Sequence, residues 1–218
     1  MTTVAFSAHI DAPWFTEQHA YWLSQLNHTE AHRYTSMKSK RKQQQMLLSR
    51  ALIAKALAKF NCSLNGAYNI VNYASLVLDN TKTFSISISH SGTMAAIVLS
   101  DRPIKLGIDI EQIKQRNFTE LATEICTTKE LSLLNKRDNI EEDFYQLWTM
   151  KESLAKASQS SLTCLYQCDC STALMNNLDS IHWQNNRYTF NQIFIPSYKG
   201  TIITNTIDYV EVIPLAES

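Results

Sequence analysis

The chain has 218 residues, of which 44% are hydrophobic, so it is long enough to bury one large core or two smaller ones. Twenty basic and twenty acidic residues give a net charge of zero, which offers no general case for binding nucleic acid. No apolar run is long enough to span a membrane, the first ten residues lack signal-peptide features, and the five cysteines show no disulfide spacing. We therefore expect a soluble, cytoplasmic protein with no nucleic-acid or membrane partner.

Charge is unevenly distributed along the chain. The segment 31–78 contains no acidic residue, whereas the region 101–152 is rich in Asp and Glu. The basic residues of the first segment are Arg33, Lys38, Lys40, Arg41, Lys42, Arg50, Lys55 and Lys59. A basic region together with an acidic cluster suits a protein that binds a polyanion and a divalent cation at the same time.

The first sixty residues are predicted to form a strand followed by helices. Residues 4–10 are short and apolar, as in a strand, and residues 14–26 have helical spacing. The longest helix is expected over 37–60, and its core-facing arc includes Arg50. Two interpretations of Arg50 stay open, because a buried Arg can pair with a carboxylate to fix the fold or reach a phosphate from a protected position.

The middle of the chain is predicted to be extended. Residues 83–90 alternate between apolar and polar side chains, and 94–99 is a second apolar run, so the two are expected to pair as a hairpin. A further strand is expected over 104–110. Asp109 and Glu111 are two residues apart, so both should point to one face, and Gly107 before them allows a close backbone approach.

The second half is predicted to contain helices and then strands. Helical patterns cover 118–134 and 144–156, and Thr128 lies either near the middle of the first of these or at the start of a new helix. Within the second helix, Glu152 and Lys156 are four residues apart and lie one above the other, which in isolation is typical of a surface ion pair. The remainder to residue 214 should be mostly extended, and a domain boundary is expected near residues 101–105.

Three carboxylates and one amine form the candidate chemical site. Asp109, Glu111 and Glu152 offer only oxygen ligands, which select a hard cation such as Mg²⁺. Lys156 beside such a cation would stabilise the charge that develops on a transferred phosphate. His90, at the end of a strand, either donates to that phosphate or bonds within its own turn, and both interpretations stay open.

Three stretches together resemble the signatures of the 4′-phosphopantetheinyl transferases, in the larger single-chain type that includes the surfactin-synthetase-activating enzyme. They are Ser-Ile-Ser-His-Ser at 87–91, Gly-Ile-Asp-Ile-Glu at 107–111 and Trp-Thr-Met-Lys-Glu-Ser-Leu-Ala-Lys at 148–156. The resemblance implies an α+β fold that is a pseudo-dimer of two similar halves, with the active site in the cleft between them. The halves would be a coenzyme-binding half over 1–103 and a metal-binding half over 104–218.

The resemblance also implies a reaction and its catalytic residues. Coenzyme A would donate its phosphopantetheine arm to a serine of an apo-carrier protein, and 3′,5′-ADP would leave. Asp109, Glu111 and Glu152 would hold Mg²⁺ on the pyrophosphate. Lys156 would contact the phosphate and help to deprotonate the serine, and Glu130 would act through a metal-bound water.

The coenzyme-binding residues implied by the resemblance lie in the first half. His90 and the Ser89 backbone would bind the coenzyme phosphates, Arg33 would lie near the 3′-phosphate, and Arg50 matches a recurrent Arg whose role is less defined. The family's usual Gly-Lys-Pro is replaced by Tyr-Ala-Ser-Leu at 73–76, which leaves a contact to be supplied elsewhere, for example by Lys82.

A second departure affects the basic residues before the long helix. Gln-Gln-Gln at 43–45 replaces a basic triplet, so the 3′-phosphate would fall to Lys38, Lys40 or Arg41, or coenzyme binding would be weaker than is usual in the family.

Two rival functions remain alongside the transferase. One is a Mg²⁺-dependent nuclease, which the zero net charge and the position of the Lys on a helix disfavour. The other is a non-catalytic module that binds a carrier protein or coenzyme A, which would not need the carboxylates and Lys156. The partner is expected to be an acidic carrier of fatty-acid, polyketide or peptide synthesis, and the protein itself is expected to be a monomer.

Overall fold

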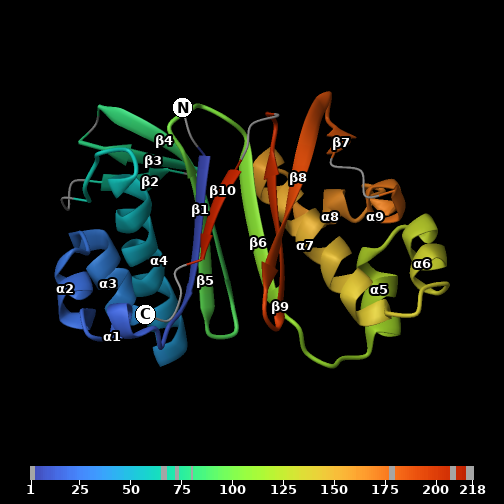
Figure 1. The fold of residues 1–218 in the computed structure, drawn as a ribbon, viewed down its shortest axis with the longest axis horizontal. Coiled ribbons are helices and arrows are strands. Elements are labelled where there is room, and N and C mark those ends of the chain that lie inside the picture. The colour runs from blue at the N-terminus through green and yellow to red at the C-terminus, as the bar shows by residue number, and fades with distance from the viewer. Residues whose placement is uncertain are drawn as a thin grey trace. The chain divides into compact units, whose positions relative to one another are not determined.

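The structure is a computed structural model that describes residues 3–64, 68–71, 74–79, 81–176, 180–206 and 210–214. The chain divides into two compact units, one made of Met1–Pro103 with Tyr209–Ser218 and the other of Ile104–Asp208. Each unit has its own sheet and its own helices (Figure 1). The predicted α+β class is confirmed, whereas the pseudo-dimer and its cleft stay a prediction.

The first unit is built on a six-stranded sheet in the order β10-β1-β5-β4-β3-β2. Its strands are β1 (Thr3–His9), β2 (Tyr68–Val71), β3 (Ser75–Leu78), β4 (Lys82–Ser91), β5 (Met94–Ser100) and β10 (Val210–Pro214). The predicted hairpin is confirmed, since β4 and β5 pair antiparallel from Ser85↔Ser100 to Ser91↔Met94. Its turn contains Gly92 at φ 57°, a left-handed conformation that favours glycine.

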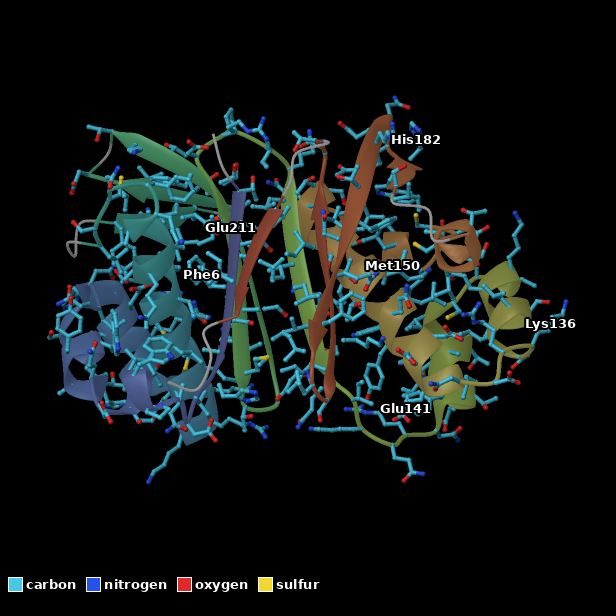
Figure 2. All side chains as sticks on the ribbon, in the orientation of Figure 1. Phe6, Lys136, Glu141, Met150, His182 and Glu211 are labelled. Atoms are coloured by element: carbon cyan, nitrogen blue, oxygen red, sulfur yellow. The ribbon has the colours of Figure 1, made fainter. Side chains whose placement is uncertain are left out.

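Four helices complete the first unit among the described residues: α1 (Pro13–Thr16), α2 (His19–Ser24), α3 (His28–Ser36) and α4 (Lys40–Ala58). The Ser39 hydroxyl accepts from the Lys42 amide and caps α4, so the long helix begins three residues later than predicted. Most of α4 from Met46 onward is buried, and it packs with Phe6 of β1 in one core (Figure 2). The predicted helix over 14–26 is two short helices, because the backbone at Gln18 departs from helical angles.

The second unit is built on an antiparallel sheet in the order β6-β9-β8-β7. Its strands are β6 (Leu106–Gln112), β7 (Ser180–Trp183), β8 (Asn186–Ile195) and β9 (Tyr198–Thr204). The helices are α5 (Phe118–Ile125), α6 (Thr128–Leu134), α7 (Ile140–Ser158), α8 (Leu162–Leu165) and α9 (Ser171–Asn176). Helix α7 packs on β6 and β9, and Met150 lies in the core that they share with the other helices (Figure 2).

Two features of the second half differ from the sequence prediction. The stretch after residue 165 was expected to be extended, yet it includes the short helix α9 before the strands begin. The last strand, β10, does not stay with the second half, because it pairs in parallel with β1 from Thr3↔Val210 to Ser7↔Pro214. The predicted half 104–218 therefore gives its final strand to the sheet of the first unit.

Helix α7 lies unusually close to strand β6 at Gly107. A Cβ atom built on Gly107 would stand 2.0 Å from the Ser153 carbonyl oxygen and 2.9 Å from the Ala157 nitrogen. The close approach expected at this glycine is confirmed. Because side chains on one strand face share a period of two, Asp109 and Glu111 lie on the same face of β6, the face that meets α7.

Within the residues that the structure describes, no helix combines the length and the apolar character needed to cross a membrane.

Replacing Gly107 by Ala should destabilise the protein by about 3 kcal/mol or more, since the added methyl group can fit only if α7 moves away from β6. Urea unfolding measures this loss. Gly200→Ala is the matched control. The nearest atom to its added Cβ would be a side-chain atom of Ile110, 3.0 Å away. Equal losses for the two variants would show that the α7–β6 contact tolerates a side chain.

Candidate active site on helix α7 and strand β6

The carboxylate of Asp109 and the ammonium of Lys156 meet where α7 crosses β6. Asp109 is only 4% exposed, and the Lys156 ammonium donates to its Oδ1 at 2.8 Å. The same ammonium donates to the Ile108 carbonyl oxygen at 2.9 Å. In an ordinary i, i+4 ion pair on a helix surface, the lysine is exposed and contacts only the carboxylate one turn away. Lys156 differs, because its ammonium is directed to β6 as well as to Glu152.

Glu152 lies in the same electrostatic environment. Burial is the largest cause that raises the pKa of its carboxyl from the ordinary 4.5 to about 7. The nearby carboxylates of Asp109 and Glu111 add to this increase, and Lys156 opposes it. The structure thus brings the three predicted carboxylates and the predicted amine into one interacting group. Half-buried Trp148, Glu152 and Lys156 follow one stripe along α7, at the edge of its packed face.

The donor set of this group fits a hard divalent cation. The three side chains offer oxygen ligands only, and their mutual repulsion is the kind of charge imbalance that a bound cation relieves. No three His, Cys, Asp or Glu side chains of the described ranges are already arranged to hold a metal ion. The group is therefore a set of suitable donors and not a preformed cage.

The second unit matches a known family. A model of the 4′-phosphopantetheinyl transferase superfamily matches residues 105–204, which include Asp109, Glu111, Glu152 and Lys156. The matched residues make up most of the second unit and less than half of the chain, so the similarity to this superfamily is a property of the second unit. The chain is also 34% identical over 74 residues to a Haemophilus influenzae protein provisionally named a 4′-phosphopantetheinyl transferase. That match covers 33% of this chain and 32% of the relative.

Glu130, the fourth acidic residue expected in the transferase site, lies in a different environment. It is fully buried, and its Oε2 accepts from the Thr127 amide at 2.7 Å in a capping box at the start of α6. Its Oε1 accepts from the Cys170 amide at 2.8 Å. The Lys151 ammonium, also 0% exposed, lies 2.9 Å from Oε2. The contacts of this carboxylate support a structural role, and its predicted action through a metal-bound water stays a prediction.

Lys151 is the residue whose importance the sequence did not reveal. Besides its ion pair with Glu130, its ammonium donates to the carbonyl oxygens of Leu165 at 3.2 Å and Cys168 at 2.8 Å. It therefore fastens α7 to α6 and to the segment that follows α8. The available signal was its position in the apolar arc with Phe144 and Leu147, where a charged side chain needs a buried partner.

In the first unit, the structure joins the predicted phosphate ligand His90 to helix α4. The exposed His90 ring lies at the end of β4, and its Nε2 is 2.7 Å from the Ser49 hydroxyl. Ser89 is buried beside it in the strand and pairs with Ala96 of β5. The His90 ring is therefore held by a contact from α4, which lies outside its own turn.

Arg50 has the structural partner that one interpretation anticipated. It is 6% exposed, and its Nε forms an ion pair with the buried Glu30 of α3. Burial raises the pKa of Glu30, while Arg50 and then Arg33 act to lower it. Arg33 itself is exposed in the last turn of α3, so of these two arginines it is the one directed to solvent.

The departures from the family pattern also have structural explanations. Lys82 lies at the far end of β4 from His90, roughly 26 Å along the strand, and donates to the Cys62 sulfur at 3.1 Å. It therefore does not supply a contact beside His90. Gln43 donates to the carbonyl oxygens of Tyr34 in the last turn of α3 and of Met37 just after it, and Gln45 donates to the carbonyl oxygen of Gly92. Tyr73, in the segment that replaces Gly-Lys-Pro, lies outside the described residues.

Lys151→Met should destabilise the protein by about 3–5 kcal/mol, because it leaves the Glu130 carboxylate buried without its counter-charge. Chemical unfolding measures the loss, and the double variant Glu130→Gln with Lys151→Met should lose clearly less than the sum of the two single variants. The control is Lys156→Met at the half-exposed pair, where a smaller loss is expected. A loss below about 1 kcal/mol for Lys151→Met would contradict the structural role.

The raised pKa of Glu152 predicts a pH dependence of stability. Because the folded-state pKa is about 7 against an ordinary 4.5, the folded protein binds this proton more tightly than the unfolded chain does. Stability should therefore fall as the pH rises across this interval, and Glu152→Gln should remove that part of the decline. Carboxyl ¹³C NMR titration gives the pKa directly. A metal-free midpoint near the ordinary value would contradict the burial of Glu152 beside the other two carboxylates.

Proposed function

We propose that this protein transfers the phosphopantetheine arm of coenzyme A to a serine of an apo-carrier protein, with release of 3′,5′-ADP. The observation that carries the proposal is the interacting group of Asp109, Glu111, Glu152 and Lys156, in a unit that matches the model of the 4′-phosphopantetheinyl transferase superfamily. The first unit would contribute the coenzyme contacts. The matched relative is covered over only 32% of its length, so activity, substrate and partner are all part of the proposal.

The three carboxylates are the proposed Mg²⁺ ligands. When bound, Mg²⁺ would neutralise the pyrophosphate and favour departure of the nucleotide. Asp109 and Glu111 are fixed by β6, whereas Glu152 comes from the half-buried stripe of α7. Because these side chains repel one another, their arrangement favours a cation over a second anion at this point.

Lys156 is the proposed phosphate-binding residue. Its ammonium is held by the Ile108 carbonyl and the Asp109 carboxylate on a partly exposed side chain, so it can present charge to a phosphate while it stays anchored to β6. The serine oxygen attacks the β-phosphate in line, the bond to the 3′,5′-ADP oxygen breaks, and the serine proton passes to the protein or to solvent. Glu152 is the candidate to receive that proton, because a carboxylate can accept it, whereas Lys156 already donates as an ammonium and would stabilise the charge on the phosphate.

The first unit offers the proposed coenzyme contacts. His90 and the Ser89 backbone would bind phosphate oxygens, and Arg33 would lie near the 3′-phosphate, helped by the exposed Lys40 and Arg41 at the start of α4. Arg50 would act indirectly, because its ion pair with Glu30 holds α3 against α4 and so supports the position of Arg33. The partner would be an acidic carrier of fatty-acid, polyketide or peptide synthesis.

The proposal is tested by incubating the protein with coenzyme A, Mg²⁺ and several apo-carrier proteins, followed by mass spectrometry of the carriers. We expect a mass increase of one phosphopantetheine on at least one carrier. Asp109→Ala should lower the rate on the order of 10²–10⁴-fold, as for loss of a metal or charge-stabilising contact. The matched control is Glu124→Gln, an exposed carboxylate on α5 whose loss should leave the rate unchanged.

The other outcomes separate the rival functions. Cleavage of DNA under the same conditions would favour a Mg²⁺-dependent nuclease. Binding of the carrier without any mass increase would favour a non-catalytic module. Full activity of Asp109→Ala would remove this residue from the metal site.

A further inference from the structure

We propose that Ser49 is a positioning residue that fixes the imidazole ring of His90 and determines which ring nitrogen meets a coenzyme phosphate. The proposal rests on the proposed function, in which His90 contacts that phosphate. It concerns a residue of α4 that lies outside the three family-like stretches.

His90 and Ser49 differ strongly in burial. His90 is exposed at the end of β4, whereas Ser49 is fully buried within α4. Their contact, 2.7 Å from Nε2 to the hydroxyl oxygen, fixes one edge of an exposed ring at a rigid point of the core. A ring held in this way loses less conformational freedom when a ligand binds, which favours affinity.

The acceptors around the Ser49 hydroxyl determine which nitrogen of His90 carries a proton in this contact. The Ser49 hydroxyl oxygen lies 2.8 Å from the Gln45 carbonyl oxygen, one helical turn earlier. A carbonyl oxygen only accepts, so the single hydroxyl proton points to Gln45. The Ser49 oxygen must then accept from His90, and Nε2 of His90 carries the proton in this contact. A phosphate oxygen only accepts, so it can bond the ring at Nδ1 only in the imidazolium form, in which Nδ1 also carries a proton.

A second hydrogen bond also connects α4 to the β4–β5 hairpin. The Gln45 side-chain amide donates to the Gly92 carbonyl oxygen at 3.0 Å, in the turn that follows His90. Helix α4 thus holds the β4–β5 hairpin both at His90 and at Gly92. This connection also gives Gln45 a function in the segment where the family usually has basic residues.

The experiment combines NMR with coenzyme binding for Ser49→Ala, His90→Ala and the double variant. Long-range ¹H–¹⁵N spectra, recorded well above the usual imidazole pKa range, should show Nε2–H in the wild type and a mixture of tautomers in Ser49→Ala. Ser49→Ala should weaken coenzyme A binding about 2- to 10-fold, as for loss of one hydrogen bond. In the His90→Ala background, it should have no further effect, because Ser49 acts through His90.

Three results would overturn the proposal: an Nδ1–H tautomer in the wild type, an unchanged tautomer in Ser49→Ala, or an equal loss of affinity whether or not His90 is present. An equal loss of affinity in both backgrounds would mean that Ser49→Ala disturbs α4 in general and does not act through His90. If the wild type does not bind coenzyme A at all, the proposed function fails, while the tautomer measurement still decides whether Ser49 orients His90.

Discussion

The close packing of helix α7 on strand β6 is the constraint on which the candidate site depends. Gly107 has no side chain, and this allows the backbone of α7 to approach β6 at Ser153 and Ala157. At this separation the Lys156 side chain reaches both the Ile108 carbonyl and the Asp109 carboxylate. The chemistry proposed for the acidic group therefore follows from a backbone contact that involves no charged residue.

Two lysines on the same helix show how burial separates structural from chemical roles. Lys151 is fully buried and its ammonium is surrounded by Glu130 and backbone carbonyls, so its charge is used to join α7 to the neighbouring segments. Lys156, little more than one turn later, keeps part of its side chain exposed and contacts the acidic group. The part of α7 that contains both lysines thus supports the fold at one end and presents charge at the other.

Much of this arrangement was predictable because it depends on local periodicity. Alternation over 83–90 predicted β4 and its hairpin, and the spacing of Glu152 and Lys156 placed both on one stripe of α7. The glycine before Asp109 predicted the close approach to α7, although not which helix would occupy the space. The match of residues 105–204 to the phosphopantetheinyl transferase superfamily agrees with the resemblance carried by the stretches at 107–111 and 148–156.

Partner choice was the part that local patterns did not determine. Nothing in the spacing showed that Arg50 pairs with Glu30, twenty residues earlier, or that Glu130 faces Lys151. The capping box formed by Thr127 and Glu130 was visible in the sequence, but the same glutamate also matched an acidic position of the family, and burial favours the structural interpretation. The return of β10 to β1 depends on contacts about two hundred residues apart, beyond any local signal.

The most direct test of the account is the pKa of the Glu152 carboxyl, followed by ¹³C NMR with and without saturating Mg²⁺ and coenzyme A. If Asp109, Glu111 and Glu152 hold the cation together, its charge should lower this pKa from about 7 to well below that value. A Glu152 pKa that does not respond to Mg²⁺ and coenzyme A would contradict a metal site at the crossing of α7 and β6.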